Sequence, residues 1–113
     1  MHELAITQSM LDLVLEQAQE VEAKEVKRIN LVIGEMSGFV EECVQFYFDF
    51  ISKGTIAERS ALSFKKIPTT ARCRSCGKLF KPKEFDWACP YCQSNIMEIV
   101  AGKELYVESI EVE

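Results

Sequence analysis

The chain has 113 residues, of which 48% are hydrophobic, and a formal net charge of −5 at pH 7. Its length suits one small domain, or one domain with an insertion, and no apolar run approaches the ~18 residues of a membrane span. The negative charge argues against general nucleic-acid binding, because such binding depends on neutralising phosphates. We therefore expect a globular protein that neither crosses a membrane nor binds nucleic acid.

The N-terminal part of the chain predicts one helix followed by one strand. Residues 4–23 repeat apolar side chains at helical spacing, and polar side chains take the opposite side. The predicted buried side of this helix consists of Leu4, Leu11, Val14, Leu15, Ala18 and Val21. Residues 27–34 instead alternate apolar and polar side chains, which is typical of a half-buried strand.

A second helix and two further strands are predicted after a glycine-containing turn. Glu41 and Glu42 supply the negative charge that a helix N-terminus favours, and the apolar residues after them keep helical spacing until Gly54. Residues 61–67 and 104–112 have the composition of strands. The second of these strands contains apolar residues interleaved with acids.

Between the last two strands lie four cysteines in the pattern C-x2-C-x12-C-x2-C, namely Cys73, Cys76, Cys89 and Cys92. Each C-x-x-C pair lets one tight turn aim two thiolates at a single point, and the intervening residues suffice for a short hairpin. Four thiolates at this spacing favour zinc, held in a tetrahedron at ~2.3 Å. Since protein ligands would fill every coordination position, we expect a structural site rather than a catalytic one.

Two other uses of these cysteines stay open. A rubredoxin-like iron site would suit Cys89-Pro90-Tyr91-Cys92, and an electron carrier of this kind would be coloured when purified. Disulfide or redox use is the other alternative. It is disfavoured because the N-terminus shows no basic and apolar export signal, and thiols in the cytoplasm stay reduced. Zinc is the preferred interpretation.

The order of these elements predicts an α/β fold with a small mixed three-stranded sheet, two helices and an inserted zinc-ribbon module with four cysteine ligands. We expect an α/β domain in residues 1–69, completed by the strand in residues 102–113. The zinc-binding ribbon is expected in residues 70–101. A ribbon of this size is too short to bury a sufficient core unaided, so it should unfold without its ion.

The predicted ribbon also carries a basic stretch with aromatic neighbours. Its cations are Arg72, Arg74, Lys78, Lys81 and Lys83, with no acid among them. Such a stretch resembles a nucleic-acid patch, but a zinc ion bound by four thiolates has a net charge of about −2 that nearby cations offset. We prefer the second interpretation, because the rest of the chain would repel phosphate.

No set of residues typical of an enzyme stands out. Cys43 lies in the second predicted helix and is interpreted as a small buried hydrophobic residue. A catalytic thiol would need an activating partner, and the only histidine of the chain is His2. Glu41 and Glu42 are adjacent, so on a helix they point about 100° apart and do not face a shared substrate. We therefore expect that the protein is not an enzyme.

The single histidine stands at an informative position. In Met1-His2, the terminal amine, the deprotonated amide nitrogen of His2 and an imidazole nitrogen can form fused chelate rings around one metal, and the amide of Glu3 can add a further nitrogen. Nitrogen ligands in a plane suit Ni(II) or Cu(II). Taken alone the motif is weak, because a histidine near a terminus is usually just solvated.

Several motifs together resemble the HypA/HybF family of nickel chaperones. They are Met1-His2-Glu3 before an amphipathic helix, Gly34-Glu35-Met36-Ser37-Gly38 after the first strand, the paired C-x-x-C turns, and Gly102-Lys103-Glu104-Leu105 with Ile110-Glu111. The resemblance covers essentially the whole chain, and the M-H-E start combined with the ribbon spacing is its most specific part. Phe39-Val40-Glu41 departs from the family, in which proline is common ahead of the second helix.

The resemblance implies a nickel site at Met1, His2 and Glu3, and structural zinc at the four ribbon cysteines. It implies a cytoplasmic metallochaperone that delivers Ni(II) during maturation of [NiFe] hydrogenase, and in some organisms of urease. The implied partners are the HypB GTPase and the hydrogenase large-subunit precursor, and the sequence leaves monomer and homodimer open. The competing interpretation is a zinc-ribbon interaction module that recruits an anionic partner through residues 72–91.

Overall fold

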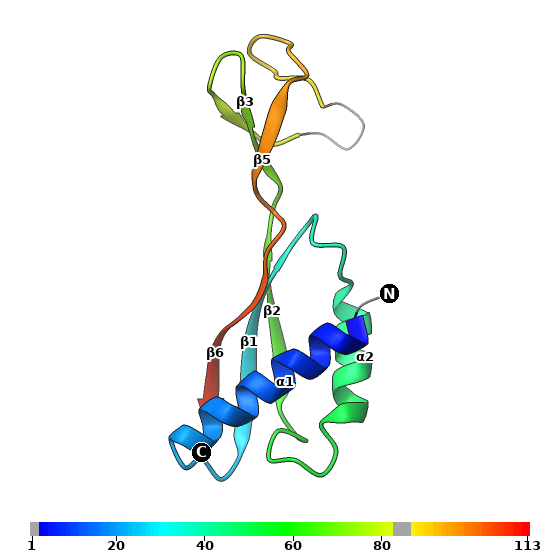
Figure 1. Ribbon diagram of the computed structural model, residues 1–113, viewed down its shortest axis with the longest axis vertical. Helices are drawn as coiled ribbons and strands as arrows, with labels where there is room; N and C mark the ends of the chain where they lie inside the picture. The colour runs from blue at the N-terminus through cyan, green and yellow to red at the C-terminus, as the bar shows by residue number, and fades with distance from the viewer. Residues whose placement is uncertain (1–2, 83–86) are drawn as a thin grey trace. The chain divides into compact units, whose positions relative to one another are not determined.

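The structure is a computed structural model that describes residues 3–82 and 87–113. Its elements in chain order are α1 (Glu3–Glu20), β1 (Val26–Gly34), α2 (Glu41–Ile51), β2 (Ala61–Ile67), β3 (Thr70–Cys73), β4 (Leu79–Phe80), β5 (Met97–Ala101) and β6 (Leu105–Val112). They form two three-stranded sheets, ordered β2-β1-β6 and β4-β3-β5 (Figure 1). The predicted α/β fold, with two helices on one sheet and a separate cysteine-rich sheet, is confirmed.

The sheet β2-β1-β6 has β1 at its centre and mixes the two strand directions. The N–H of Glu113 donates to the carbonyl of Glu25 (2.9 Å), so β6 ends where β1 begins and the two strands are antiparallel. The hydroxyl of Ser60 donates to the carbonyl of Val26 (2.5 Å), so β2 begins where β1 begins and these two strands are parallel. This arrangement matches the mixed sheet that the sequence predicts.

The chain divides into two compact units. The first, called here the helical unit, contains the described residues up to Val32 together with Phe39–Lys65 and Leu105–Glu113. The second, called the ribbon unit, contains Ile33–Gly38 and Lys66–Glu104. The turn between β1 and α2 therefore belongs with the cysteine-rich sheet, although it is distant from that sheet in sequence.

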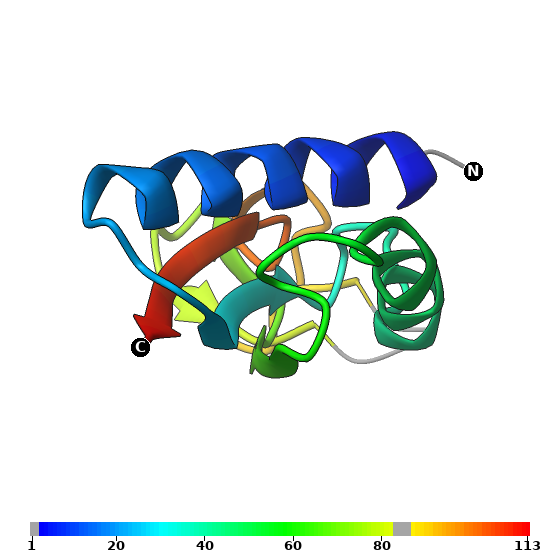
Figure 2. The ribbon, with the colours of Figure 1, turned by 90° about the horizontal axis from the view of Figure 1, so that it is seen from below.

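One face of the sheet β2-β1-β6 supplies the core of the helical unit. Alternation along β1 places Ile29 and Leu31 on this face, where α1 and α2 cover them (Figure 2). The buried members of this core are Leu11, Val14, Ala18, Val26, Ile29, Leu31, Phe48 and Ala57. On the opposite face, the side-chain amide of Asn30 of β1 donates to the hydroxyl of Ser109 of β6 at 3.0 Å.

The helix α1 is shorter than predicted and buries fewer residues. Leu4 and Val21 are exposed, at 48% and 64%, although the sequence pattern places both on the buried side. The helix ends because Glu22 adopts a left-handed φ of 54°, with its N–H bonded to the Gln19 carbonyl at 3.0 Å. Since this position is usually glycine, the sequence contained no obvious stop signal.

The ribbon unit has a much smaller core. Strand β3 pairs antiparallel with β4 on one side and β5 on the other. The hydrophobic cluster of the cysteine-rich sheet has the buried residues Ala71, Cys73, Phe80 and Cys89, against which Met97 and Ile99 pack. Two of the four buried residues are thus candidate metal ligands, so little apolar surface remains to hold this unit together.

The turn after β1 is tied to both connections of the ribbon. The N–H of Glu35 donates to the carbonyl of Ile67 (2.9 Å), and the N–H of Met36 donates to the carbonyl of Gly102 (2.6 Å). A Cβ atom on Gly34 would overlap the backbone of Gly102. Glycine is therefore required at residue 34 by close backbone approach.

Candidate metal centre

The first C-x-x-C pair lies on a tight turn that follows β3. The N–H of Cys73 donates to the carbonyl of Lys78 (2.9 Å), and the N–H of Gly77 donates back to the carbonyl of Cys73 (2.8 Å). Gly77 has φ 76°, a conformation that glycine adopts without strain. This backbone arrangement brings Cys73 and Cys76 to one side of the turn.

The second pair lies on a turn of the same construction. The N–H of Cys89 donates to the carbonyl of Ser94 (2.8 Å), and the N–H of Gln93 donates to the carbonyl of Cys89 (2.8 Å). Gln93 takes the place of glycine, with φ 65°. The hydroxyls of Ser75 and Ser94 lie 2.9 Å apart, so a hydrogen bond joins the two turns. The sequence pattern alone did not reveal this serine pair.

The structure brings together the four predicted ligands. All four sulfur atoms lie within 4.8 Å of one another. Cys73 Sγ is 3.4 Å from Cys92 Sγ, and Cys76 Sγ is 3.7 Å from Cys89 Sγ. Sulfurs bound at ~2.3 Å in a tetrahedron are ~3.8 Å apart, whereas a disulfide requires ~2.05 Å. The spacing therefore fits one tetrahedral ion.

Backbone amides influence how these thiols ionise. The N–H of Cys76, 3.5 Å from Cys73 Sγ, is the main cause that lowers the pKa of the Cys73 thiol to about 6. At Cys92 the N–H of Ser94 acts to lower the pKa, but the Cys73 sulfur and burial act against it and raise the pKa to about 12. Within this neighbouring pair, loss of the proton is therefore favoured at Cys73 and opposed at Cys92.

The four thiols differ in how readily they lose their protons, and a bound cation would favour proton loss from all of them. Cys73 and Cys89 are buried, whereas Cys76 and Cys92 are exposed. Burial opposes ionisation of Cys89, but the amides of Tyr91 and Cys92 outweigh it and lower the pKa of this thiol. A divalent cation would replace the remaining protons and stabilise all four thiolates together.

The basic stretch of the ribbon is largely engaged within the unit. Arg72 and Arg74 lie 3.8 and 3.4 Å from the carboxylate of Glu98. The ammonium of Lys78 stands 4.6 Å from the centre of the Tyr91 ring. The carboxylate of Glu98 offsets part of the positive charge that the sequence offered for a nucleic-acid patch, whereas the Tyr91 ring leaves the charge of Lys78 unchanged. Lys83, predicted as part of that stretch, lies outside the described residues.

The predicted N-terminal site is described only at its last member. Glu3 is the first residue of α1, and its carbonyl accepts a hydrogen bond from the hydroxyl of Thr7 (2.5 Å). Met1 and His2 lie outside the described residues. Residues 3–82 and 87–113 contain one group of potential metal ligands at ligand spacing, the four ribbon cysteines. Cys43 is half-buried rather than buried.

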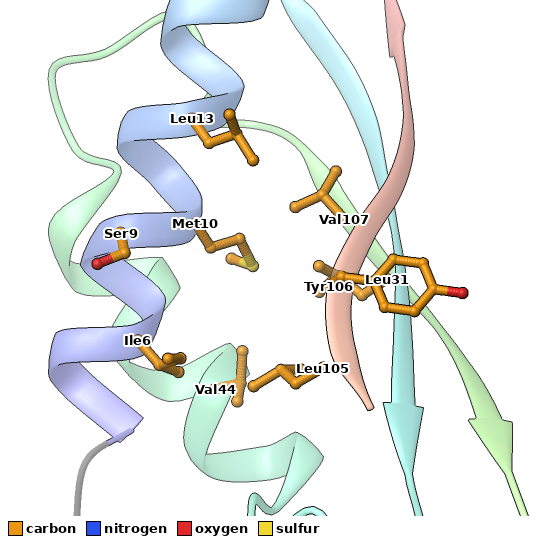
Figure 3. A pocket seen from close by; sticks show the side chains of 9 residues that line it. All are labelled: Ile6, Ser9, Met10, Leu13, Leu31, Val44, Leu105, Tyr106 and Val107. Atoms are coloured by element: carbon orange, nitrogen blue, oxygen red, sulfur yellow. The ribbon is translucent and has the colours of Figure 1, made fainter. Parts of the chain in front are cut away.

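The helical unit contains an apolar pocket that offers no such ligands. The pocket has a volume of about 270 Å³ and lies between α1, the start of α2, β1 and β6 (Figure 3). Met10 and Val107 point into it, whereas the ring of Tyr106 points away. The four-cysteine cluster is thus the candidate metal centre among the described residues.

The fold and this cluster define a small α/β metal-binding protein. A family model described as "HypA: Hydrogenase/urease nickel incorporation, metallochaperone, hypA" matches residues 1–112. The chain belongs to this family of nickel-incorporation metallochaperones. The family acts in hydrogenase maturation, and its members are maturation factors rather than enzymes.

Individual relatives and solved structures agree with the family model. A hydrogenase maturation factor HypA from Dehalococcoides mccartyi is 45% identical over 113 residues, covering 100% of this chain and 95% of its own length. The factor from Caldanaerobacter subterraneus subsp. tengcongensis is 40% identical over 114 residues, with 100% of both chains covered. The solution structure of the Ni metallochaperone HypA from Helicobacter pylori matches with a TM-score of 0.69 and 25% identity, covering 99% of this chain and 97% of that one.

Neither helix in the described part of the chain combines the length and the apolar character that a membrane crossing requires.

Proposed function

We propose that this protein binds Ni(II) at its N-terminus and delivers it to [NiFe] hydrogenase during maturation. The ligands would be the amine of Met1, the amide and imidazole nitrogens of His2, and the amide nitrogen of Glu3. The observation that carries this proposal is the family match, which begins at residue 1.

The four ribbon cysteines would hold a structural Zn(II) ion. Four sulfur ligands at tetrahedral spacing support zinc, and a centre with every position filled by protein leaves no place for a substrate. In this proposal residues 70–101 form the zinc module, and residues 1–69 with 102–113 form the nickel-binding domain. The transported ion and the structural ion would then occupy separate sites.

Delivery would proceed by ligand exchange with a partner. A terminal site can release its ion without disturbing the fold, whereas the four-cysteine centre is closed. The proposed partners are the HypB GTPase and the hydrogenase large-subunit precursor, acting in the cytoplasm, where thiols stay reduced. The relatives are named for hydrogenase maturation, and the family description covers urease as well. Activation assays with each apo-enzyme would distinguish these two recipients.

A Ni(II) binding isotherm on untagged protein tests the proposed site. The native chain and the His2→Ala variant would be compared while bound zinc is measured in both. We expect His2→Ala to lose nickel binding and to retain its zinc and its fold. Lowering the pH should also weaken nickel binding, because protons compete for the imidazole (pKa ~6.5) and the amine (~7.7–8.0).

Two results would overturn the proposed nickel site. If both proteins bind nickel equally, the ligands lie elsewhere in the chain. If neither protein binds nickel while zinc is retained, the chain does not carry nickel at its N-terminus. An added residue before Met1 provides a matched control, because it removes the terminal amine from the chelate but leaves His2 in place.

A further inference from the structure

The exposed side of α2 carries two phenyl rings in one row. Phe46 and Phe50 are 69% and 70% exposed, although both are large and apolar. Residues four apart lie on the same line of a helix, separated by ~6 Å along its axis, so the two rings are neighbours. Glu42 begins the same row one turn earlier. A row of exposed aromatic rings on a helix is typical of a contact surface.

A groove runs beside this row, between α2 and β2. Its volume is about 410 Å³, and its lining residues all belong to the helical unit. They are Glu41, Glu42, Gln45, Phe46, Asp49 and Phe64. We call this surface the α2 groove. The strand β2, which contributes Phe64, is an edge strand of its sheet, so no further strand covers it on that side.

The α2 groove combines an apolar floor with a negative rim. Glu41, Glu42 and Asp49 form no ion pair with any residue of the described chain. Asp49 accepts one hydrogen bond, from the side-chain amide of Gln45 (2.7 Å). Lys53 stands 5.9 Å from the centre of the Phe50 ring, beyond the groove lining. The three carboxylates therefore remain available to cations from outside the chain.

We propose that the α2 groove docks a basic amphipathic helix of a partner protein. Apolar side chains four apart on such a helix have the same ~6 Å spacing as Phe46 and Phe50, so the two rows can interdigitate. Lysine or arginine side chains beside that apolar row would reach the carboxylates of the rim. The rim would then orient the partner and accelerate its association, while the phenyl rings supply the apolar contact.

The charge of the groove disfavours the other occupants. A second copy of the chain, docked groove to groove about a two-fold axis, would bring each acidic rim against an identical acidic rim. Nucleic acid and anionic lipid surfaces carry the same sign of charge as the rim and would be repelled. A basic polypeptide is the class of macromolecule that satisfies both the rings and the carboxylates.

The position of α2 gives this surface a second significance. Both views of the structure show the start of α1 beside α2 (Figures 1 and 2). A partner helix bound in the α2 groove would therefore contact α2, and α2 lies beside the start of α1. The docking proposal does not depend on nickel, and it goes beyond the proposed metal delivery by specifying the chemistry of a partner.

A titration of the zinc-loaded full chain with a synthetic peptide tests the proposal. The probe is a peptide of about fourteen residues with leucines at helical spacing and lysines elsewhere, and the matched control replaces each lysine with glutamate. Amide NMR signals report the binding position residue by residue. We expect shifts confined to α2 and β2 with the lysine peptide, weakening as salt is raised, and no binding of the glutamate peptide.

Variants of the α2 groove show whether binding depends on the groove residues themselves or only on the overall negative charge of the chain. Phe46→Ala and the double variant Glu41→Gln/Glu42→Gln should each weaken binding by about tenfold or more. The control is Glu16→Gln/Glu20→Gln, which removes two exposed carboxylates from α1 and should bind the peptide as the native chain does. Thermal unfolding of each variant shows whether the fold is retained.

Four results would overturn the proposal. They are absence of binding, shifts centred on the pocket of Figure 3 or on the ribbon unit, equal binding of both peptides, and equal weakening in the α1 control. Analytical sedimentation of the native chain tests the alternative that a second copy of the chain occupies the α2 groove. Concentration-dependent dimers that Phe46→Ala abolishes would assign the α2 groove to self-association instead. None of these outcomes depends on whether His2 binds nickel.

Discussion

The helical unit and the ribbon unit are stabilised by different means, although they belong to one short chain. The helical unit buries Leu11, Ile29, Leu31 and Phe48, which are among the largest fully buried side chains of the described residues. In the hydrophobic cluster of the cysteine-rich sheet, two of the four buried residues are cysteines. Apolar burial holds the first unit, whereas we expect the second to need the proposed ion to complete its core. A change in one unit should therefore leave the other largely intact.

Removing the metal should have the largest effect, and it should fall on the ribbon unit alone. Structural zinc contributes about 10–16 kcal/mol of apparent binding free energy in small zinc peptides, far more than the core of this unit supplies. We expect chelation, or Cys89→Ser, to abolish the ordered amide signals of β3, β4 and β5. The signals of α1 and α2 should persist, as measured by NMR and hydrogen exchange.

The matched control for metal removal is Cys43→Ser. Cys43 lies in α2, half-buried and outside the cluster, so this variant should retain one zinc ion per chain. Loss of helical signals at the same chelator concentration as ribbon signals would contradict the separation of the two units. Zinc loss from Cys43→Ser would contradict the assignment of the ligands.

Truncation of a side chain in the core of the helical unit should have the next largest effect, and this effect should fall on the helical unit rather than on the ribbon unit. Phe48 is 1% exposed, so Phe48→Ala should lower the free energy of unfolding by about 3–5 kcal/mol through lost burial and the cavity left behind. Phe46→Ala, on the exposed side of the same helix, should change it by less than about 0.5 kcal/mol. Denaturant unfolding of zinc-loaded protein measures both. Equal effects of the two variants would contradict the burial assigned to α2.

A smaller effect is expected at the turn between β1 and α2, which belongs to the ribbon unit. Gly34→Ala would force Cβ into the backbone of Gly102 and should destabilise by about 3 kcal/mol, the upper part of the range for overpacking. Gly38→Ala, in the same turn, meets no neighbouring atom but has φ +83°, so it should cost only about 1–2 kcal/mol. Thermal unfolding of both variants compares the cost of steric overlap at Gly34 with the cost of the left-handed backbone at Gly38. A larger loss of stability in Gly38→Ala would contradict the close approach of Gly34 to the backbone of Gly102.

The sequence predicted much of the two units, for identifiable reasons. Strand β2 occupies the predicted residues, because a β-rich segment closed by Pro68 has clear limits. The four ligands converge as predicted, because metal coordination restricts both residue type and spacing. Local patterns of this kind reflect constraints that act over a few residues.

Features that depend on contacts distant in sequence could not be predicted in the same way. Leu4 and Val21 fit the helical pattern but are exposed, because burial depends on what the rest of the fold brings against α1. The need for glycine at residue 34 arises from Gly102, which lies near the other end of the chain. The rings of Phe46 and Phe50 have the composition of a core, and the structure was needed to show that they are exposed.

The smallest predicted effect concerns the protons released when zinc enters the ribbon. Coordination requires all four cysteines as thiolates. In a folded ribbon the pKa of Cys73 is lowered to about 6, so at about pH 7.5 this thiol would lose its proton before the ion binds. The pKa of Cys92 is raised to about 12, so this thiol would release its proton only when the ion binds. Since we expect the metal-free ribbon to be unfolded, with ordinary thiol pKa values of ~8.5, zinc binding at about pH 7.5 should release nearly four protons, whereas a folded metal-free ribbon would release fewer.

Acid separates these two outcomes, because a group with a depressed pKa regains its proton only as the pH falls through the lowered value. In a folded metal-free ribbon the count would rise by about 0.7 proton from Cys73 between about pH 7.5 and 5.5. In the unfolded ribbon that we expect, the count should stay near four, because ordinary thiols are mostly protonated at both pH values. Calorimetry in buffers of different ionisation enthalpy measures the count at each pH. A count that starts well below four and rises in acid would contradict the expected unfolding, and it would show that the amide of Cys76 stabilises the Cys73 thiolate before the ion binds. In that case the backbone of the turn, and not the ion alone, would prepare the sulfurs for binding.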